Sequence, residues 1–352
     1  MEASHIYRSL AARFGYEDSP DFLRLLQFLM SEAEANLAAA LPASVEELSA
    51  RLGVPAEDAR RELDDMFRRG LVFPRNFYTG EGARFARSLV QLHDATQSAL
   101  SLDPEKDREL YDMWEAFCLA GYDRDYALGY LKLDKPHSRV VPAYKAVKDC
   151  PELQPYEDVR EFLKAAERLA VVSCSCRKRA QAEHRPCEKS HDRNCIQFNR
   201  GAEYAIVRGS GRELSLDEAL NIVDETEEHG LVHSWFNSRS MVGVIMCNCC
   251  YDCCVDWARL RHHGVPISTR WEKSRFEARI DTRACTGCQT CVERCQFEAI
   301  AMTPVPGSKK LKATVDPEKC WGCGVCALGC AADAIRLDLV RPLEHIPDVA
   351  AP

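Results

Sequence analysis

The 352-residue chain lacks a long apolar run, and no stretch approaches the roughly 20 apolar residues that a membrane-spanning helix needs. Its first residues, Met1–Arg8, lack a basic segment followed by an apolar one, so we expect no export signal. The chain also lacks a P-loop, a Rossmann fingerprint and a convincing Ser/His/Asp set. These absences predict a cytoplasmic protein without membrane insertion and without a recognisable catalytic motif.

The chain also has few positive charges relative to its negative ones: it contains 46 Lys and Arg and 54 Asp and Glu, which gives a net charge of −8. This balance argues against a nucleic-acid partner and favours protein partners with basic surfaces. Cysteine, in contrast, is abundant, with 19 copies. In a protein kept in a reducing cytoplasm, clustered cysteines indicate metal ligands and not disulfides. Exposed clusters would favour an anaerobic setting.

A cysteine pattern occurs twice near the C-terminus, and both copies have the spacing C-x2-C-x2-C-x3-C. The first copy comprises Cys285, Cys288, Cys291 and Cys295, and the second comprises Cys320, Cys323, Cys326 and Cys330. Each cysteine of the second copy follows its counterpart by 35 positions. Four thiolates in C-x2-C pairs also suit zinc, but the doubled eight-cysteine register favours two [4Fe–4S] clusters.

This repeat resembles the bacterial two-cluster ferredoxin over residues 277–340. The resemblance implies one cluster held by Cys285, Cys288, Cys291 and Cys330, and another held by Cys320, Cys323, Cys326 and Cys295. It also implies strand pairs of 278–282 with 336–339 and of 299–303 with 312–316, and an exposed turn over 304–310. The chain departs from the family by having Gln296 and Ala331 where proline usually follows the fourth cysteine.

A third group comprises Cys174, Cys176, Cys187 and Cys195. Nine Lys or Arg against four Asp or Glu lie between positions 174 and 212, which suits an anionic cluster. We interpret this group as a third cluster, with zinc and free thiols as alternatives. His184 and His191 could replace a cysteine, although solvated loop histidines are the simpler interpretation.

A fourth group has five thiols within eight residues: Cys247, Cys249, Cys250, Cys253 and Cys254. A cubane has four iron corners, so we expect four of the five to hold a fourth cluster. A buried strand over 241–246 is expected to lead into the motif. Two alternatives remain open: the middle groups share ligands in a single cluster, or the cysteines are merely small buried hydrophobes. His233 is a candidate ligand or sulfur hydrogen-bond donor, but a structural role is more consistent with its context.

The expected fold is α+β and multidomain. Residues 1–150 form an α-rich region, with an amphipathic helix over 1–40 and a winged-helix-like segment at about 43–85 that opens with the capping box Ser44–Glu47. A cysteine-rich domain follows at 151–275, a ferredoxin domain at 276–340 and a tail at 341–352.

The order of winged-helix-like region, C-x-C-R motif, Gly230-Leu-Val-His233, C-N-C-C-x2-C-C motif and ferredoxin repeat is similar to that of multi-cluster ferredoxin-type proteins of anaerobes. The resemblance implies electron transfer to or from a partner oxidoreductase or flavoprotein. Two alternatives are a catalytic iron–sulfur oxidoreductase subunit and a redox-sensing transcription regulator. The candidate recognition helix of the regulator, 56–69, holds five acids and four arginines, whereas DNA readers normally present a basic face.

Overall fold

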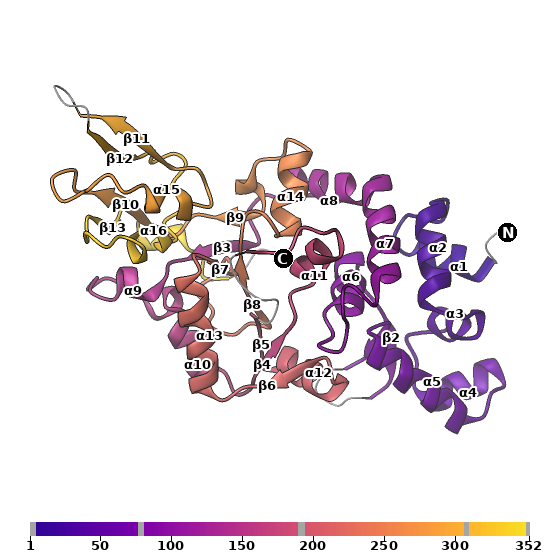
Figure 1. Ribbon diagram of the computed structural model, residues 1–352. Helices are drawn as coiled ribbons and strands as arrows, with labels where there is room; N and C mark the ends of the chain where they lie inside the picture. The colour runs from indigo at the N-terminus through magenta and orange to yellow at the C-terminus, as the bar shows by residue number, and fades with distance from the viewer. Residues whose placement is uncertain (1–4, 77–80, 189–193, 306–309, 350–352) are drawn as a thin grey trace. The chain divides into compact units, whose positions relative to one another are not determined.

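The computed structural model describes residues 5–76, 81–188, 194–305 and 310–349 (Figure 1). The chain mixes helices and strands and is α+β. It forms two compact units: the first comprises Met1–Asp125, Val172–Pro186 and Tyr204–Arg212, and the second comprises Tyr126–Val171, Cys187–Glu203 and Glu213–Pro352. No helix in the described ranges combines the length and apolar character needed to span a bilayer.

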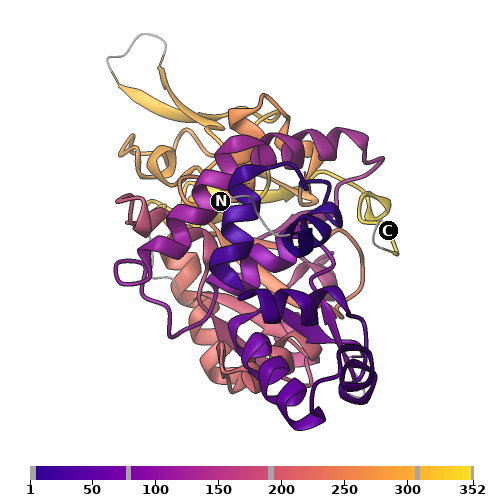
Figure 2. The same ribbon diagram turned by 90° about the vertical axis from the view of Figure 1, so that its right-hand side faces the viewer.

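The first unit is mainly helical (Figure 2). Its elements are α1 (His5–Ala12), α2 (Pro20–Leu29), α3 (Glu32–Ala39), α4 (Val45–Leu52), α5 (Ala56–Arg69), β1 (Val72–Pro74), β2 (Ala83–Phe85), α6 (Leu89–Gln97), α7 (Arg108–Phe117), the π-helical turn η1 (Cys118–Tyr122) and α11 (Ser175–Ala182). Two further helices, α8 (Asp123–Gly129) and α12 (Arg200–Arg208), cross the boundaries of the units along the chain.

The expected single helix over 1–40 is wrong, because three helices occupy this segment. Ser19 and Ser31 start α2 and α3 by accepting hydrogen bonds from the first-turn N–H groups, and Gly15 has a left-handed φ of 78°. Phe22 of α2 stacks on Phe117 of α7, with ring centroids 4.5 Å apart, and so anchors the helices in one core.

Helices α4 and α5 and the antiparallel pair β1–β2 follow one another in the region expected to resemble a winged helix. The predicted capping box is confirmed, because Ser44 and Glu47 bond reciprocally at the start of α4. Gly53 and Gly70 end the two helices in the left-handed conformation. Residues 77–80, between the two strands, lie outside the described part, and the winged-helix assignment remains a prediction.

A seven-stranded sheet in the order β6-β4-β5-β8-β7-β3-β9 lies mainly in the second unit, although Gly211 and Arg212 of β6 and Val172 of β4 are assigned to the first. Its strands are β3 (Ser138–Val141), β4 (Leu169–Val172), β5 (Cys195–Phe198), β6 (Gly211–Glu213), β7 (Val232–Phe236), β8 (Ile245–Cys249) and β9 (Trp271–Glu272). The pairs β5–β8, β8–β7 and β7–β3 are antiparallel, whereas β3–β9 is parallel. The remaining helices here are η2 (Tyr130–Lys132), α9 (Tyr144–Val147), η3 (Pro155–Glu157), α10 (Val159–Ala165), α13 (Leu216–Glu228), α14 (Val255–His262), η4 (Ile267–Thr269) and η5 (Leu343–His345).

Helices α10 and α13 pack against this sheet around Trp235. The ring of Trp235 stacks on Phe162 of α10 at 4.5 Å and meets Phe198 of β5 edge-on at 4.9 Å. Met246 of β8 is fully buried in the same core. The expected strand over 241–246 is wrong in its start, since β8 begins at Ile245 and Val242 is 76% exposed. The strand therefore carries Cys247 and Cys249 itself.

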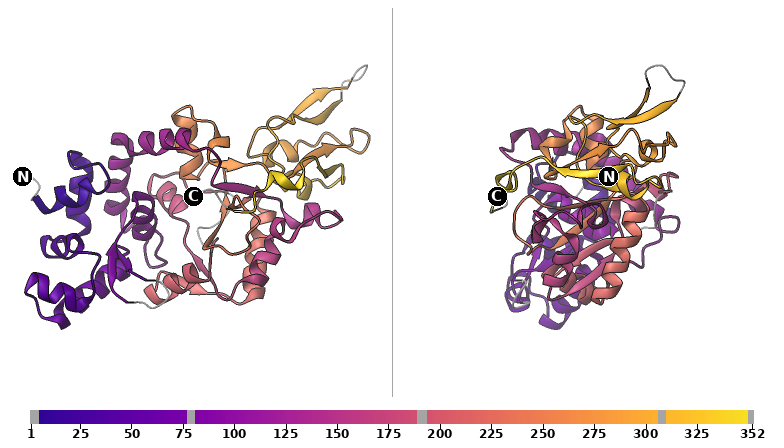
Figure 3. Two further views of the ribbon diagram at one scale, coloured as in Figure 1. Left: turned by 180° about the vertical axis from the view of Figure 1, so that it is seen from behind. Right: turned by 90° about the vertical axis from the view of Figure 1, so that its left-hand side faces the viewer.

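The C-terminal part of the second unit consists of two short antiparallel pairs and two short helices. Strand β10 (Phe276–Ile280) pairs with β13 (Ile335–Leu339), and β11 (Ile300–Pro304) pairs with β12 (Leu311–Val315), which confirms both predicted pairings. The helices are α15 (Thr290–Arg294) and α16 (Val325–Leu328). The β11–β12 pair extends away from the seven-stranded sheet (Figure 3). Most of the expected turn over 304–310 falls on residues 306–309, outside the described residues.

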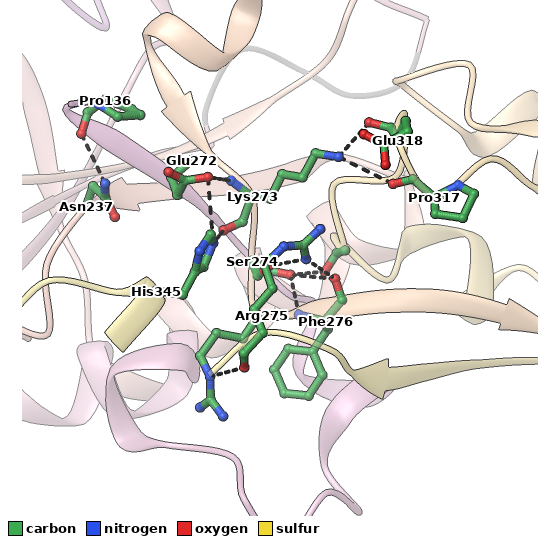
Figure 4. Close-up of polar contacts among 12 residues, drawn as sticks. Pro136, Asn237, Glu272, Lys273, Ser274, Arg275, Phe276, Pro317, Glu318 and His345 are labelled. Atoms are coloured by element: carbon green, nitrogen blue, oxygen red, sulfur yellow. Dashed lines mark hydrogen bonds and ion pairs between the residues drawn. The ribbon is translucent and has the colours of Figure 1, made fainter. Parts of the chain in front are cut away.

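The segment that links β9 to β10 holds this C-terminal part in place through backbone carbonyls (Figure 4). Lys273 Nζ donates to the carbonyl oxygens of Glu318 and Pro317, at 2.5 and 3.4 Å. The Ser274 hydroxyl donates to the carbonyl of Gly322 at 2.8 Å, next to the cysteines of the second repeat. These bonds connect the seven-stranded sheet to the cysteine loops.

Candidate metal centres

One small cavity lies beneath the first cysteine repeat. It is lined by Cys285, Cys288, Cys291 and Cys330, with Ile280, Ala313 and Ile335 supplying apolar walls. Cys285 and Cys288 lie in the loop before α15, Cys291 lies in the first turn of α15, and Cys330 follows α16. These are the four cysteines that the sequence assigns to one cluster. Hydrogen bonds from Thr290 lower the pKa of the Cys288 thiol, which favours its thiolate form.

A second cavity is lined by Cys295, Cys320, Cys323 and Cys326, the other set assigned from the sequence. Phe297, Trp321 and Ile300 close it on the apolar side. Burial and the neighbouring thiols raise the pKa of Cys326 to about 12, and burial raises the pKa of Cys323 as well. Thiols crowded in this way become thiolates when a metal centre supplies positive charge, so the site is suited to a cation with four sulfur ligands.

Backbone N–H groups point at the cysteine sulfurs in both repeats. The N–H of Ala299 donates to Cys295 Sγ at 3.2 Å, and the N–H of Ala334 donates to Cys330 Sγ at 3.3 Å. The two bonds occupy equivalent places in the repeat. Such bonds stabilise the anionic thiolate and tune the potential of an iron–sulfur cluster. Four thiols, N–H donors and an apolar lining fit a [4Fe–4S] cubane in each cavity.

Comparison with protein families supports this chemistry. Residues 284–334 match the family model of the 4Fe-4S dicluster domain, which spans both repeats. No curated protein and no solved structure matches the chain significantly. The protein is therefore an iron–sulfur protein that binds [4Fe–4S] clusters, and the dicluster domain accounts for the C-terminal cysteines. That each of these eight cysteines ligates iron as paired above stays a prediction.

Six of the middle cysteines form two sets in the second unit. In the first set, Cys187 Sγ and Cys250 Sγ lie 3.6 Å apart, and the Cys253 thiol hydrogen-bonds to both residues. These three sulfurs and a carboxylate oxygen of Asp252 all lie within 4.8 Å of one another. Hydrogen bonding to Cys187 is the largest cause that raises the pKa of Cys253, to about 12. This group has the donors to hold a metal.

The second set comprises Cys247, Cys249 and Cys254. The Cys249 thiol hydrogen-bonds to Cys247 and to Cys254, and these bonds, with burial, raise its pKa well above the ordinary value. Between the two strand cysteines, buried Asn248 bonds to the ring nitrogen Nδ1 of His233 at 2.7 Å and donates to the carbonyl of Asn194 at 2.6 Å. His233 thus contacts the amide that separates two cysteines, in agreement with its expected structural role.

The remaining residues of the third predicted group are placed as follows. Cys195 begins β5 in the second unit, whereas Cys174 and Cys176 lie at the start of α11 in the first unit. His184 follows α11 and contacts Arg108 within the first unit. His191 lies outside the described residues. Cys118 is buried within the first unit, and the Cys150 thiol bonds to Glu152 at 3.6 Å.

The basic residues after Cys176 have partners of their own within the first unit. Lys178 donates to the carbonyls of Ala99 and Leu102, both at 2.6 Å. Arg179 contacts Glu115 and bonds to Glu183 at 3.0 Å. The excess of positive charge noted in the sequence therefore serves partly to anchor α11.

Several residues that support the sites were not found by sequence reasoning. Gln296, only 5% exposed, bonds to the backbone of Gly230 and Tyr251, and Arg294 donates to the carbonyls of Val325, Glu227 and Glu228. The only signal in the sequence was the departure from proline at Gln296. Trp257, Phe297 and Trp321 also gave no periodic signal, because they come together from three separate segments.

Proposed function

We propose that this protein is an electron-transfer component that passes electrons through several [4Fe–4S] clusters to or from a partner oxidoreductase. The dicluster domain supplies two of these centres, and the two middle sets of thiols supply the others. In this role the partner oxidoreductase supplies the substrate chemistry.

The main support for the proposal is a group of packed apolar side chains that extends from the middle cysteines to the dicluster domain. It contains Cys254 and Trp257 on one side and Trp321 on the other, and partly buried Cys249 and Cys323 pack against it. Phe297 connects the sides: its ring lies 5.3 Å from Trp257 and stacks on Trp321 at 5.2 Å and 20°. A packed apolar bridge excludes water between two thiol sites, which suits transfer between redox centres.

The proposal is tested on protein purified without oxygen. Iron analysis is expected to give about sixteen irons per chain, and a redox titration followed by EPR is expected to give at least three reducible cubanes. Spin coupling between a middle centre and the dicluster domain would support transfer along the chain. About eight irons, or two uncoupled signals only, would leave the dicluster domain alone and contradict the proposal.

The catalytic alternative has a separate test, which is turnover of candidate substrates by the isolated chain with an artificial electron donor. Turnover would overturn a purely electron-carrying role. The regulator alternative is disfavoured by the charge pairing of α5. Its arginines Arg61 and Arg69 bond to acids of the same helix at 2.9 and 2.7 Å, and Arg60 lies 3.8 Å from Glu46. DNA phosphates would have to displace these acids.

A further inference from the structure

The five cysteines between 247 and 254 divide between two environments. Strand β8 places successive side chains on opposite faces, so Cys247 and Cys249 share one face. Met246 and Asn248 occupy the other, where Met246 joins the core and Asn248 bonds to His233. The alternation separates both cysteines from the core and directs them to one site.

Cys195 belongs to the same face as Cys247. In the antiparallel β5–β8 pair, Ile196 lies opposite Met246. The next position of this register sets Cys195 opposite Cys247, and residues directly opposite in such a pair have Cβ atoms roughly 4.5–5.5 Å apart. The side-chain amide of Asn248 donates to the carbonyl of Asn194 at 2.6 Å, which places Asn194 beside Asn248, as the same register predicts.

The turn after β8 produces the division of the remaining thiols. The N–H of Cys254 donates to the carbonyl of Cys250 at 3.1 Å, which closes a tight turn. This turn brings the Cys253 thiol within hydrogen-bonding distance of the Cys250 and Cys187 thiols. The Cys254 thiol instead hydrogen-bonds to the Cys249 thiol. Each adjacent pair, 249/250 and 253/254, therefore contributes one thiol to each set.

We propose that the middle region holds two [4Fe–4S] centres with interleaved ligands. Cys195, Cys247, Cys249 and Cys254 hold one centre, and Cys187, Cys250 and Cys253 supply three thiolates of the other. The proposal rests on the proposed iron–sulfur function and deepens it. The first of these centres is the one next to the apolar bridge, because Cys254 is part of this bridge and Cys249 packs against it together with Cys323. The peptide bond between Cys249 and Cys250 then joins the two centres covalently.

Non-additivity of alanine substitutions tests the ligand sets in the full chain, purified without oxygen. Cys195→Ala and Cys247→Ala are expected to change the same EPR signal, and the double variant is expected to lose no more iron than either single one. Cys187→Ala and Cys195→Ala are expected to change different signals, and their double variant is expected to lose about eight irons where each single variant loses about four.

The proposal is overturned if the Cys187/Cys195 double variant loses only as much iron as one single variant, because both residues would then ligate one cluster. Cys150→Ala is the matched control and is expected to keep all iron, since Cys150 lies outside both sets. Retained dicluster signals verify folding in every variant. A wild-type protein with only about eight irons would instead contradict the four-cluster function itself, so the two failures are distinguishable.

Discussion

Gln296 accepts a hydrogen bond from the backbone N–H of Tyr251, with Oε1 and the nitrogen 3.0 Å apart. Its amide nitrogen donates to the carbonyl of Gly230 at 2.9 Å. One side chain of the dicluster domain thus holds both the cysteine turn after β8 and the loop before β7. Proline at this position could make neither bond, because it has no side-chain polar group, so the departure from proline at Gln296 supplies both contacts.

Replacing Gln296 with Ala is expected to destabilise the protein by about 1–3 kcal/mol, because two backbone groups lose their partners in a buried site. The measurement is the temperature at which the cluster absorbance is lost under anaerobic conditions. Ala331→Ser, at the exposed equivalent position of the second repeat, is the control and is expected to change little. Equal effects of both variants would show that Gln296 has no special part in stability.

A second prediction compares two glycines with nearly identical backbone angles. Gly322 has φ of 66° and Gly264 has φ of 67°. A methyl group at Gly322 would overlap the carbonyl oxygen of Phe276 and the Ser274 hydroxyl, whereas a methyl group at Gly264 would meet open space. Gly264→Ala is therefore expected to cost only the left-handed backbone strain, about 1–2 kcal/mol.

Gly322→Ala is expected to cost more than Gly264→Ala and to reduce iron content, because Cys320 and Cys323 flank the displaced loop. Thermal unfolding and iron analysis measure both effects. If the two variants were equally stable and bound iron equally well, the close approach at Gly322 would have no role in cluster binding.

A third prediction concerns Trp257, which is 3% exposed and contacts Phe297 and Trp271. Trp257→Ala leaves a cavity and is expected to cost about 3–5 kcal/mol. It also admits water to the bridge, so faster loss of cluster absorbance in air is expected. Val242→Ala, at a position that is 76% exposed, is the control. An unchanged melting temperature in Trp257→Ala would contradict the packing described here.

A fourth prediction concerns the pH dependence of stability in the first unit. Burial raises the pKa of Glu115 to about 7, although contact with Arg179 opposes this shift. Between the ordinary pKa of 4.5 and about 7, the folded state binds more protons at Glu115 than the unfolded state. The contribution of Glu115 to stability therefore falls as the pH rises through this window.

Glu115→Gln removes this titration and is expected to flatten the stability profile between pH 5 and pH 7, by an amount on the order of 2 kcal/mol. Circular dichroism melts at several pH values measure it. Glu109→Gln, exposed on the same helix, is expected to keep the wild-type slope. If the stability of Glu115→Gln fell as steeply with pH as that of the wild type, groups other than Glu115 would cause the pH dependence.

Local signals in the sequence were sufficient for some features. The resemblance of the doubled cysteine repeat to the two-cluster ferredoxin implied both strand pairs of the dicluster domain, including β10–β13, whose strands lie far apart in the chain. The capping box at Ser44 marked a helix start, because its two partners are only three residues apart. The order of sheet strands did not follow from local signals, since β3 pairs with β7 and with β9, and β5 pairs with β8, across long stretches of the chain.

The grouping of the middle cysteines likewise needed the structure. Cys187 and Cys250 are 63 residues apart, and only the fold brings their sulfurs to 3.6 Å. Cys247 and Cys249 share one face because β8 runs through the motif. The sequence predicted a strand that ends before the motif, so it gave no sign of this shared face. From the sequence alone, the five thiols were expected to compete for the four iron corners of one cluster. In the structure, β8 and the turn after it place them in two separate sets.

The cysteine loop of the second repeat is held in part by hydrogen bonds from residues next to strands of the seven-stranded sheet. The N–H of Ala143, just after β3, donates to the carbonyl of Cys323 at 2.9 Å, and the N–H of Ser274 donates to the carbonyl of Trp321 at 3.2 Å. Excising the dicluster domain as a fragment from residue 276 onward would strip both bonds and expose the indole of Trp321. Such a fragment would be hydrated on the side of the cluster that the intact chain keeps dry, so its redox potential would not report that of the whole protein.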